Sequence, residues 1–363
     1  MKPARNKLRE FLSPLFNTKG SKEEEPKSES DSESKSLSLL DIMIDGREYE
    51  SLNKVKGAKV NIEEEIVKSF AEIKAARKRE IICYAGNVVN QILKGSRSID
   101  STDDLPFSEM VNSVPSGVKD IDVILVTGGG NATQVSKFVD KLRSRFDNVT
   151  FLIPNIAMSA GTVFALSGNE IIMGPGSYLG PIDPQVPNQD GMYVPALAIL
   201  NMVEEIQKRG EELIKKGLQP RWTDQHILRF LDKHSLASGK GFSEHIIKMA
   251  EKYLVAYKFR DWVTHSDTKT PVTDVEKAKR ASEIANLLCD HSTWKVHDRG
   301  ITREEAWSLC KLKITPVETN PDLERALRRF WALLYFIFET SLILKIYSSN
   351  SYYVAKPGVT TAN

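Results

Sequence analysis

The chain has 363 residues, with 50 Lys or Arg against 48 Asp or Glu, so its formal net charge is only +2. Proteins that neutralise many phosphates usually have a strong basic excess, so this balance argues against nucleic acid as a partner. The three cysteines are odd in number and form no CxxC pair, which argues against a disulfide framework or a zinc site. We therefore expect a globular protein in a reducing, cytoplasmic setting, with no metal and no other cofactor.

Residues 1–58 are expected to form a largely disordered tail and linker. The first 20 residues mix basic and apolar side chains but lack the continuous apolar run of a secretory signal. Leu8, Phe11 and Leu12 have helical spacing beside basic residues, which suits a short element for an anionic membrane surface, although Pro14 interrupts it. The alternative is a tail that docks weakly or not at all. Residues 20–36 are rich in Ser, Glu and Lys and are typical of a solvated linker.

The middle of the chain alternates helical and strand patterns. Apolar residues with a period of 3 to 4 predict a helix over residues 60–79 and another between residues 131 and 146. Short continuous apolar runs that end in turns predict strands, at 80–86, 121–130, 148–154 and 170–177. Continuous apolar strands that alternate with helices indicate a parallel sheet buried on both faces. After residue 194 the pattern is helical and charged, and we interpret its charge runs as solvated helix faces.

The segment 330–344 is apolar, but only 15 residues lie between Arg329 and Lys345, and Glu339 is among them. A spanning helix needs about 20 mostly apolar residues. We expect a core or subunit-interface helix, with a helix lying in a membrane interface as the alternative. Residues 316–363 are therefore assigned to an apolar helix and a loose tail, and residues 59–315 to the main domain.

Two glycine-containing turns fall where a strand gives way to a helix. The first holds Gly128, Gly129 and Gly130, but it is not a dinucleotide fingerprint because the position that needs the last glycine is Thr133. Three glycines leave backbone N–H groups unshielded at the edge of the sheet where ligands usually bind. The second turn places Ser159 at the start of a helix, whose free N–H groups stabilise an oxyanion. A lone serine there would more often be a helix cap. Because the two turns are one βα unit apart, they are expected to lie side by side.

A third element, GPGSYLGPIDPQVP, is dense in Gly and Pro and carries one carboxylate, Asp183. It could be only a rigid surface loop. An acid fixed between Pro181 and Pro184 is, however, well placed to orient a histidine.

Together TGGG, AMSAGT and LGPIDPQ resemble the serine dehydrogenase proteinase family, relatives of the Clp proteolytic subunit and signal peptide peptidase A in the crotonase-like superfamily. The resemblance covers residues 80–200. It implies an α/β fold, a Clp/crotonase-like spiral of ββα units, here with a helical C-terminal extension. It implies Ser159 as nucleophile, Asp183 as the acid of a Ser, Asp, His triad, and an oxyanion hole from Gly129, Gly130 and the N–H of Ala160. The sequence departs from the Clp pattern at Gly128, where the relatives have proline.

The general base must come from later in the chain, since no histidine occurs between Ser159 and His226. His297 follows one helical pattern and precedes another, a loop position that resembles the family's histidine segment, and His291 is the next choice. The rival base is a lysine, as in signal peptide peptidase A. Lys208, or Lys215 on the same predicted helix, would then have to be desolvated.

The resemblance implies an ATP-independent serine endopeptidase that acts on polypeptides as a homo-oligomer. Two other classes remain open: a crotonase-like acyl-CoA enzyme, and an inactive oligomer that binds peptides or membrane partners. An α/β-hydrolase is disfavoured because Ala157 stands where the GxSxG elbow needs glycine. We expect a cytoplasmic protein with a possible peripheral membrane contact through the basic N-terminal segment or the C-terminal helix.

Overall fold

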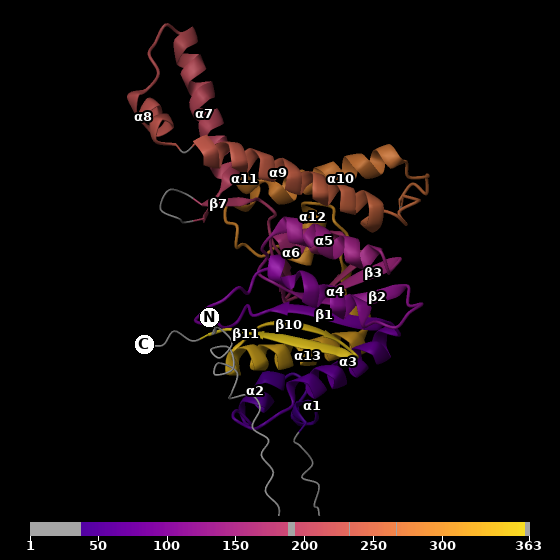
Figure 1. The fold of residues 1–363 in the computed structure, drawn as a ribbon. Helices are drawn as coiled ribbons and strands as arrows, with labels where there is room; N and C mark the ends of the chain where they lie inside the picture. Colours follow the sequence, from indigo (N-terminus) through magenta and orange to yellow (C-terminus); the bar gives the residue numbers. More distant parts are fainter. Residues whose placement is uncertain (1–37, 188–192, 232, 266, 360–363) are drawn as a thin grey trace, which may run out of the picture. The chain divides into compact units, whose positions relative to one another are not determined.

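A seven-stranded mixed sheet organises the part of the chain that the structure, a computed structural model, describes: residues 38–187, 193–231, 233–265 and 267–359. The strand order is β11-β10-β1-β2-β3-β5-β9 (Figure 1). The parallel strands are β1 (Glu80–Gly86), β2 (Asp120–Val126), β3 (Asn148–Ile153), β5 (Glu170–Met173) and β9 (Thr315–Pro316). Two further strands, β10 (Ile343–Ser349) and β11 (Tyr352–Pro357), continue the sheet in antiparallel pairing.

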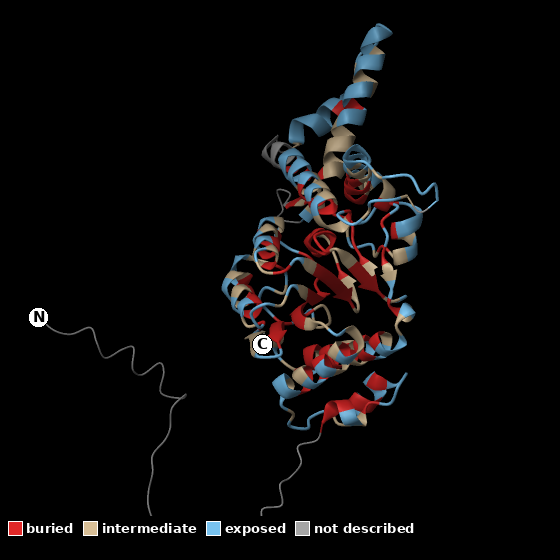
Figure 2. Ribbon diagram, turned by 90° about the vertical axis from the view of Figure 1, so that its right-hand side faces the viewer, coloured by how far each residue is buried: buried red, intermediate tan, exposed pale blue. Residues whose placement is uncertain are grey.

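Both faces of this sheet are covered by helices. Side chains alternate along a strand, so Ile82 and Tyr84 of β1 enter one core while Ile81 and Cys83 enter the other. The first core lies under α4 (Asp104–Asn112), α5 (Ala132–Arg143), α6 (Ala160–Leu166), α9 (Lys233–Tyr253) and α10 (Asp274–Cys289). The second lies under α1 (Leu39–Ile42), α2 (Glu48–Asn53), α3 (Ile62–Arg77) and α13 (Pro321–Thr340). The central strands are accordingly buried on both sides (Figure 2).

The α/β fold class expected from the sequence is confirmed. The helix predicted over residues 60–79 is α3, which begins where the Asn61 side chain accepts a hydrogen bond from the N–H of Glu64. The predicted strands are β1, β2, β3 and β5, and continuous apolar runs identified them because both faces are covered.

Short elements complete the chain. Beside the sheet lie β4 (Ile156–Ala157), β6 (Tyr178–Leu179), β7 (Gln185–Pro187), β8 (Tyr193–Pro195), η1 (Ser101–Asp103) and η3 (Val317–Thr319). The remaining helical elements are α7 (Ala196–Lys215), α8 (Trp222–Phe230), η2 (Leu254–Lys258), α11 (His291–Trp294) and α12 (Arg303–Ser308).

The structure corrects the extent of the N-terminal linker. Residues 39–53 form α1 and α2, and Leu39, Leu40 and Leu52 are buried in the second core. Arg329 holds this segment in place, since its guanidinium donates to the Leu40 carbonyl (2.7 Å). Because this partner lies 289 residues away in the sequence, local sequence patterns did not predict the two helices. The basic N-terminal segment considered for membrane contact lies outside the described residues.

The C-terminal boundary is also corrected. The break predicted between residues 315 and 316 falls inside β9, and the expected loose tail contributes β10 and β11 to the sheet. The apolar helix is α13, and its side chains, Phe330 and Phe338 among them, are buried in the second core. It is thus a core helix. No helix in the described part of the chain has the length and apolar content needed to cross a bilayer.

A buried ionic cluster fastens β10 to the segment before α4. Lys345 is 0% exposed, and its Nζ donates to Asp103 Oδ1 (2.7 Å) and Asp100 Oδ2 (3.0 Å). The hydroxyls of Tyr84 (2.9 Å) and Tyr347 (2.5 Å) donate to the same Asp103 carboxylate. Burial opposes the ionised form of Asp100, but hydrogen bonds from Ser96, Thr102 and Lys345 outweigh it and hold its pKa well below the usual range.

Candidate active site

Ser159 occupies a sharp turn between β4 and α6. Its backbone has φ 51° and ψ −118°, a positive φ that a residue with a side chain rarely adopts. The side chain makes no capping hydrogen bond to α6, so the simple role of a helix cap is not realised. A strained strand-to-helix turn with an uncommitted hydroxyl is the arrangement that exposes a nucleophile.

The glycine turn packs directly against Ser159. Gly129 has φ +107°, and a Cβ there would lie 2.8 Å from Ser159 Cβ and 2.9 Å from the Met158 carbonyl oxygen. Only glycine fits so close an approach. Thr127 Oγ1 accepts a hydrogen bond from the Gly129 N–H (3.1 Å). Among the predicted oxyanion donors, the N–H groups without a partner in the described structure are therefore those of Gly130 and Ala160.

Asp183 and His297, 114 residues apart in the chain, are in direct contact. Their Oδ1 and Nδ1 atoms lie 2.8 Å apart, and the Asp183 side chain is only 1% exposed. A carboxylate that holds the Nδ1 side of an imidazole leaves Nε2 available as a base. In the described structure no hydrogen bond joins the Ser159 hydroxyl to this histidine. Such bonds are often long or absent in enzymes without substrate.

A second histidine faces the other oxygen of the same carboxylate. His291 Nδ1 lies 3.4 Å from Asp183 Oδ2, and both atoms are buried without a hydrogen bond in the described structure. Of the two histidines, His297, the one favoured by its loop position in the sequence, has the shorter contact with Asp183.

Hydrogen bonds of the backbone and of the Thr162 hydroxyl hold the Asp183 loop beside the Ser159 turn. The Gly180 N–H donates to Thr162 Oγ1 (2.9 Å), which in turn donates to the Ala157 carbonyl (2.8 Å). Leu179 and Ile301 exchange two backbone hydrogen bonds, which brings the segment after His297 to β6. Thr162 was not among the predicted site residues, although it belongs to the AMSAGT motif on which the resemblance rests.

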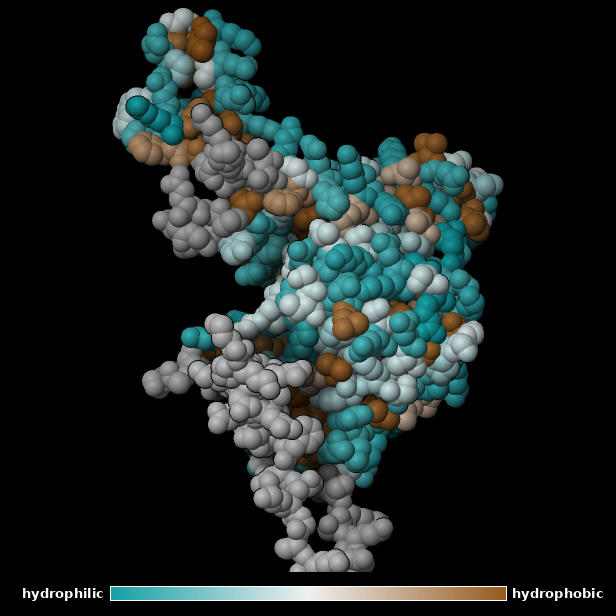
Figure 3. Space-filling model, in the orientation of Figure 1, coloured by the Kyte–Doolittle hydropathy of each residue, from teal (hydrophilic) through white to brown (hydrophobic). Residues whose placement is uncertain are grey.

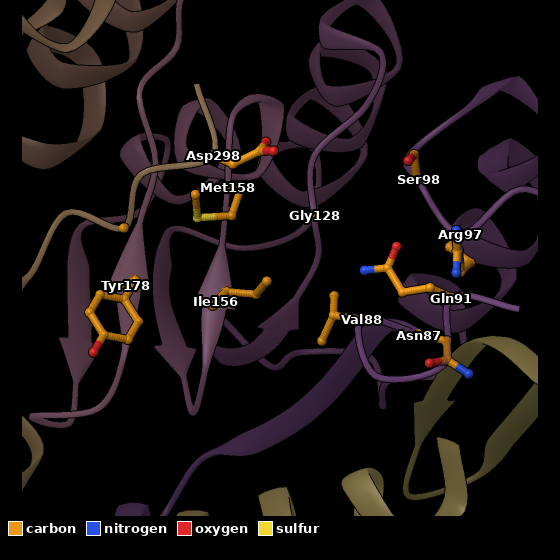
Figure 4. Close-up of a pocket in the computed structure, with 11 residues that line it drawn as sticks. Asn87, Val88, Gln91, Arg97, Ser98, Gly128, Ile156, Met158, Tyr178 and Asp298 are labelled. Atoms are coloured by element: carbon orange, nitrogen blue, oxygen red, sulfur yellow. The ribbon is translucent and has the colours of Figure 1, made fainter. Parts of the chain in front are cut away.

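A cavity of about 620 Å³ opens between these segments. Its lining includes Gly128, Met158 and Asp298, which are the chain neighbours of Gly129, Ser159 and His297. In Figure 4, Met158 and Asp298 lie on one side of the cavity and Arg97 and Ser98 on the other, with Gly128 between them. The glycine turn, the Ser159 turn and the segment after His297 thus border one space large enough for a section of a substrate chain.

Other nucleophiles and bases fit this site less well. Burial, with the nearby charges of Asp183 and Asp290, raises the pKa of the Cys289 thiol to about 12, and burial raises that of Cys310 to about 12. These thiols stay protonated near neutral pH. Lys208 is exposed on α7, which removes the desolvation that a lysine base requires. The described residues contain no group of His, Cys, Asp or Glu that could hold a metal ion.

Comparison with known families confirms the resemblance. Residues 77–218 match the model of the ClpP-like SDH-type serine proteinases. The matched segment contains the glycine turn, the Ser159 turn and the Asp183 loop, and it ends before His297. The family match supports a serine peptidase.

Two uncharacterized proteins of Methanocaldococcus jannaschii are similar to the chain. One is 30% identical over 56% of this chain and 53% of its own length, and the other is 29% identical over 55% and 56%. The chain therefore spans about half the length of the curated relatives it matches.

Among solved structures, two variants of the 1510-N membrane-bound stomatin-specific protease align with the chain. One covers 60% of this chain and 74% of its own, at 15% identity and a TM-score of 0.34. The other, in complex with a substrate peptide, covers 72% and 84%, at 16% identity and a TM-score of 0.35.

Proposed function

We propose that this chain, whose residues 77–218 match the ClpP-like SDH-type serine proteinases, is a serine endopeptidase with Ser159 as nucleophile, His297 as base and Asp183 as orienting acid. The observation that carries the proposal is the 2.8 Å contact of the buried Asp183 carboxylate with His297, beside the cavity that Met158 borders. A carboxylate-held imidazole next to a strained serine turn is the constellation for acyl transfer.

The reaction would follow from these roles. Ser159 Oγ attacks the scissile carbonyl while His297 Nε2 takes its proton and passes it to the leaving amine. Asp183 keeps the proton of His297 on Nδ1 and stabilises the imidazolium. The N–H groups of Ala160 and Gly130 receive the developing oxyanion, aided by the N-terminus of α6. Water then hydrolyses the acyl-enzyme, with His297 acting first as base and then as acid.

We propose a polypeptide substrate and a reaction without ATP. The glycine turn at residues 128–130 fails the spacing of a nucleotide fingerprint because Thr133 stands at the critical position. Three buried free cysteines suit a reducing, cytoplasmic compartment. We also propose a peripheral contact of this protein with a membrane surface.

A fluorophosphonate probe tests the assignment, because it labels only an activated serine. We expect the wild-type protein to be labelled and Ser159→Ala to be unlabelled. Ser98→Ala is the matched control, since Ser98 lines the same cavity and should be dispensable. An unlabelled wild-type protein, or label that survives in Ser159→Ala, would show that the serine peptidase assignment is wrong. An acyl-CoA enzyme or an inactive binding protein would leave the wild-type protein unlabelled.

The glycine turn supplies a second test. In Gly129→Ala the new Cβ would meet Ser159 Cβ at 2.8 Å in a backbone with φ +107°, so the nucleophile and the oxyanion donors must shift. We expect the labelling rate to fall by roughly 10² to 10³, the usual loss when an oxyanion donor is removed. Gly128→Ala is the control, because its Cβ would meet nothing within 4 Å. Equal rates in the two variants would contradict this role for Gly129.

A further inference from the structure

The cavity beside the Ser159 turn carries opposite charges on two of its sides. Among the described residues that line it, Arg97 has the one positive charge and Asp298 the one negative charge. Figure 4 shows Asp298 beside Met158 on one side and Arg97 on the other. No ion pair joins Arg97 to Asp298 or to any other carboxylate in the described structure. Each charge is therefore free to act on a different part of a bound molecule.

Arg97 is held in place but keeps most of its hydrogen-bonding capacity. Its Nη1 donates to the Asn90 carbonyl (2.7 Å), and within the described residues its other N–H groups have no acceptor. Hydrophilic side chains dominate the face of the molecule in Figure 3, so a charged residue at the surface is ordinary. Arg97 differs because it is half-buried in the wall of a cavity. Partial desolvation without a counter-charge costs free energy, which a carboxylate of a ligand would offset.

The segment that carries Arg97 is fixed to the sheet. The Asn87 side chain, 2% exposed, donates to the Ile343 carbonyl (2.8 Å) and accepts from the N–H of Asn90 (2.8 Å). A Cβ at Gly86 would lie 2.5 Å from the Arg97 carbonyl oxygen, so the backbone of Arg97 packs against the end of β1. A guanidinium on a fixed wall loses less conformational entropy when it binds a ligand.

This wall lies next to the glycine turn of the proposed oxyanion hole. The N–H of Ile99 donates to the Gly129 carbonyl (2.8 Å), and a Cβ at Gly130 would lie 2.3 Å from the Ile99 carbonyl oxygen. Arg97 stands two residues before Ile99, and two residues of chain span at most about 7 Å. A polypeptide whose scissile carbonyl meets the Gly130 N–H therefore has its neighbouring residues within reach of Arg97.

On the basis of the peptidase function proposed above, we propose that Arg97 determines which polypeptides this site accepts. It binds a carboxylate of the substrate within about three residues of the cleaved bond. Arginine holds a carboxylate through paired hydrogen bonds, which a neutral amide of the same shape does not reproduce. Asp298 repels a carboxylate on the other side of the cavity, which favours the Arg97 side for the acidic group.

A purely structural role for Arg97 explains less. Its hydrogen bond to the Asn90 carbonyl ties the segment together, but that bond uses a single N–H group and needs no positive charge. A structural role also makes a different prediction: variants of Arg97 would then slow the cleavage of all peptides to the same extent.

The test compares peptides that differ in one carboxylate. A synthetic library of random peptides, with free or amidated C-termini, first identifies cleaved sequences by mass spectrometry. We expect kcat/KM of the wild type to fall about 10- to 100-fold when the glutamate nearest the cleaved bond becomes glutamine, or when the free C-terminus is amidated. The first result assigns the carboxylate to a side chain, and the second assigns it to the end of the substrate chain.

Variants then connect the preference to Arg97. Arg97→Gln should cleave the acidic and the neutral peptide at equal rates. Arg97→Glu should reverse the preference, so that a peptide with lysine at this position is cleaved faster than one with glutamate. Lys94→Gln and Lys94→Glu are the controls of equal charge change, because Lys94 is exposed in the same segment and does not line the cavity. They should keep the wild-type preference.

Fluorophosphonate labelling of Ser159 separates the two proposals. A labelled wild type that cleaves acidic and neutral peptides equally would overturn the role of Arg97 and leave the peptidase function standing. This comparison needs no variant, so it holds even if Arg97→Gln does not fold. Retention of the acidic preference in a folded Arg97→Gln would overturn the role as well. An unlabelled wild type that cleaves no peptide would overturn the peptidase function, and the role of Arg97 with it.

Discussion

Replacing His297 by alanine is expected to lower kcat/KM by roughly 10⁴- to 10⁶-fold, the range found when a triad histidine is removed. The physical reason is that His297, held at Nδ1 by Asp183 (2.8 Å), is the group proposed to take the proton from Ser159. The expected measurement is turnover of an unfolded polypeptide together with the labelling rate, because both depend on the same proton transfer. The melting temperature is measured beside these rates, because the variant also leaves the Asp183 carboxylate, which is 1% exposed, without its nearest partner.

Two variants make the result specific. His291→Ala should have a clearly smaller effect, because its Nδ1 lies 3.4 Å from Asp183 Oδ2, beyond good hydrogen-bond distance. Lys208→Ala should leave the rate unchanged, since that lysine is exposed on α7. Full activity of His297→Ala would remove it from the triad, and a comparable loss in His291→Ala alone would transfer the role to His291.

Lys345→Met is expected to lower the free energy of unfolding by about 3 to 5 kcal/mol, the usual cost of removing one partner from a buried ion pair. The variant leaves the Asp103 carboxylate, itself 0% exposed, without its nearest cation. Urea unfolding at pH 7 gives the comparison. Lys356→Met is the control, because its Nζ is 3.3 Å from Asp103 and its side chain is 28% exposed, and it should cost less than about 1 kcal/mol.

This cluster also predicts the direction of a pH effect. The pKa of Asp100 is lowered in the folded protein, so its contribution is complete above its ordinary pKa of about 4 and is lost as the pH falls. The difference between the wild type and Lys345→Met should therefore shrink in acid. A constant difference from pH 7 to pH 3, or equal losses in the two lysine variants, would contradict the assigned role of the cluster.

The same cluster lies close to the reactive turn. Asp100 follows Ile99, whose N–H donates to the Gly129 carbonyl (2.8 Å) and whose carbonyl accepts from Asn131 (2.8 Å). A shift of Asp100 in Lys345→Met would reach Gly129 through these bonds. We therefore expect slower labelling in that variant even where it is fully folded.

The sequence by itself determined the parts that depend on local pattern. Continuous apolar runs marked β1, β2 and β3, because a strand buried on both faces has no polar alternation. The spacing of Ile66, Phe70 and Ile73 marked α3 because helical period and burial coincide there. The motifs around Gly129, Ser159 and Asp183 were recognisable for a similar reason, since each needs particular small or charged residues at fixed positions.

Only the tertiary structure decided the parts that depend on distant partners. His297 lies 114 residues from Asp183. Its loop position favoured it over His291 only through the resemblance, and the contacts of the two histidines with Asp183 came from the fold. The helices at 39–53 contact Arg329, and β10 and β11 extend the sheet from the edge of β1. A short segment gives no sign of such distant partners in its own sequence. Thr127, whose hydroxyl accepts the Gly129 N–H, likewise becomes visible only when the turn is folded. Local patterns determine where helices and strands form. Which of several similar side chains contacts a given site residue is determined by the packing that brings remote segments together.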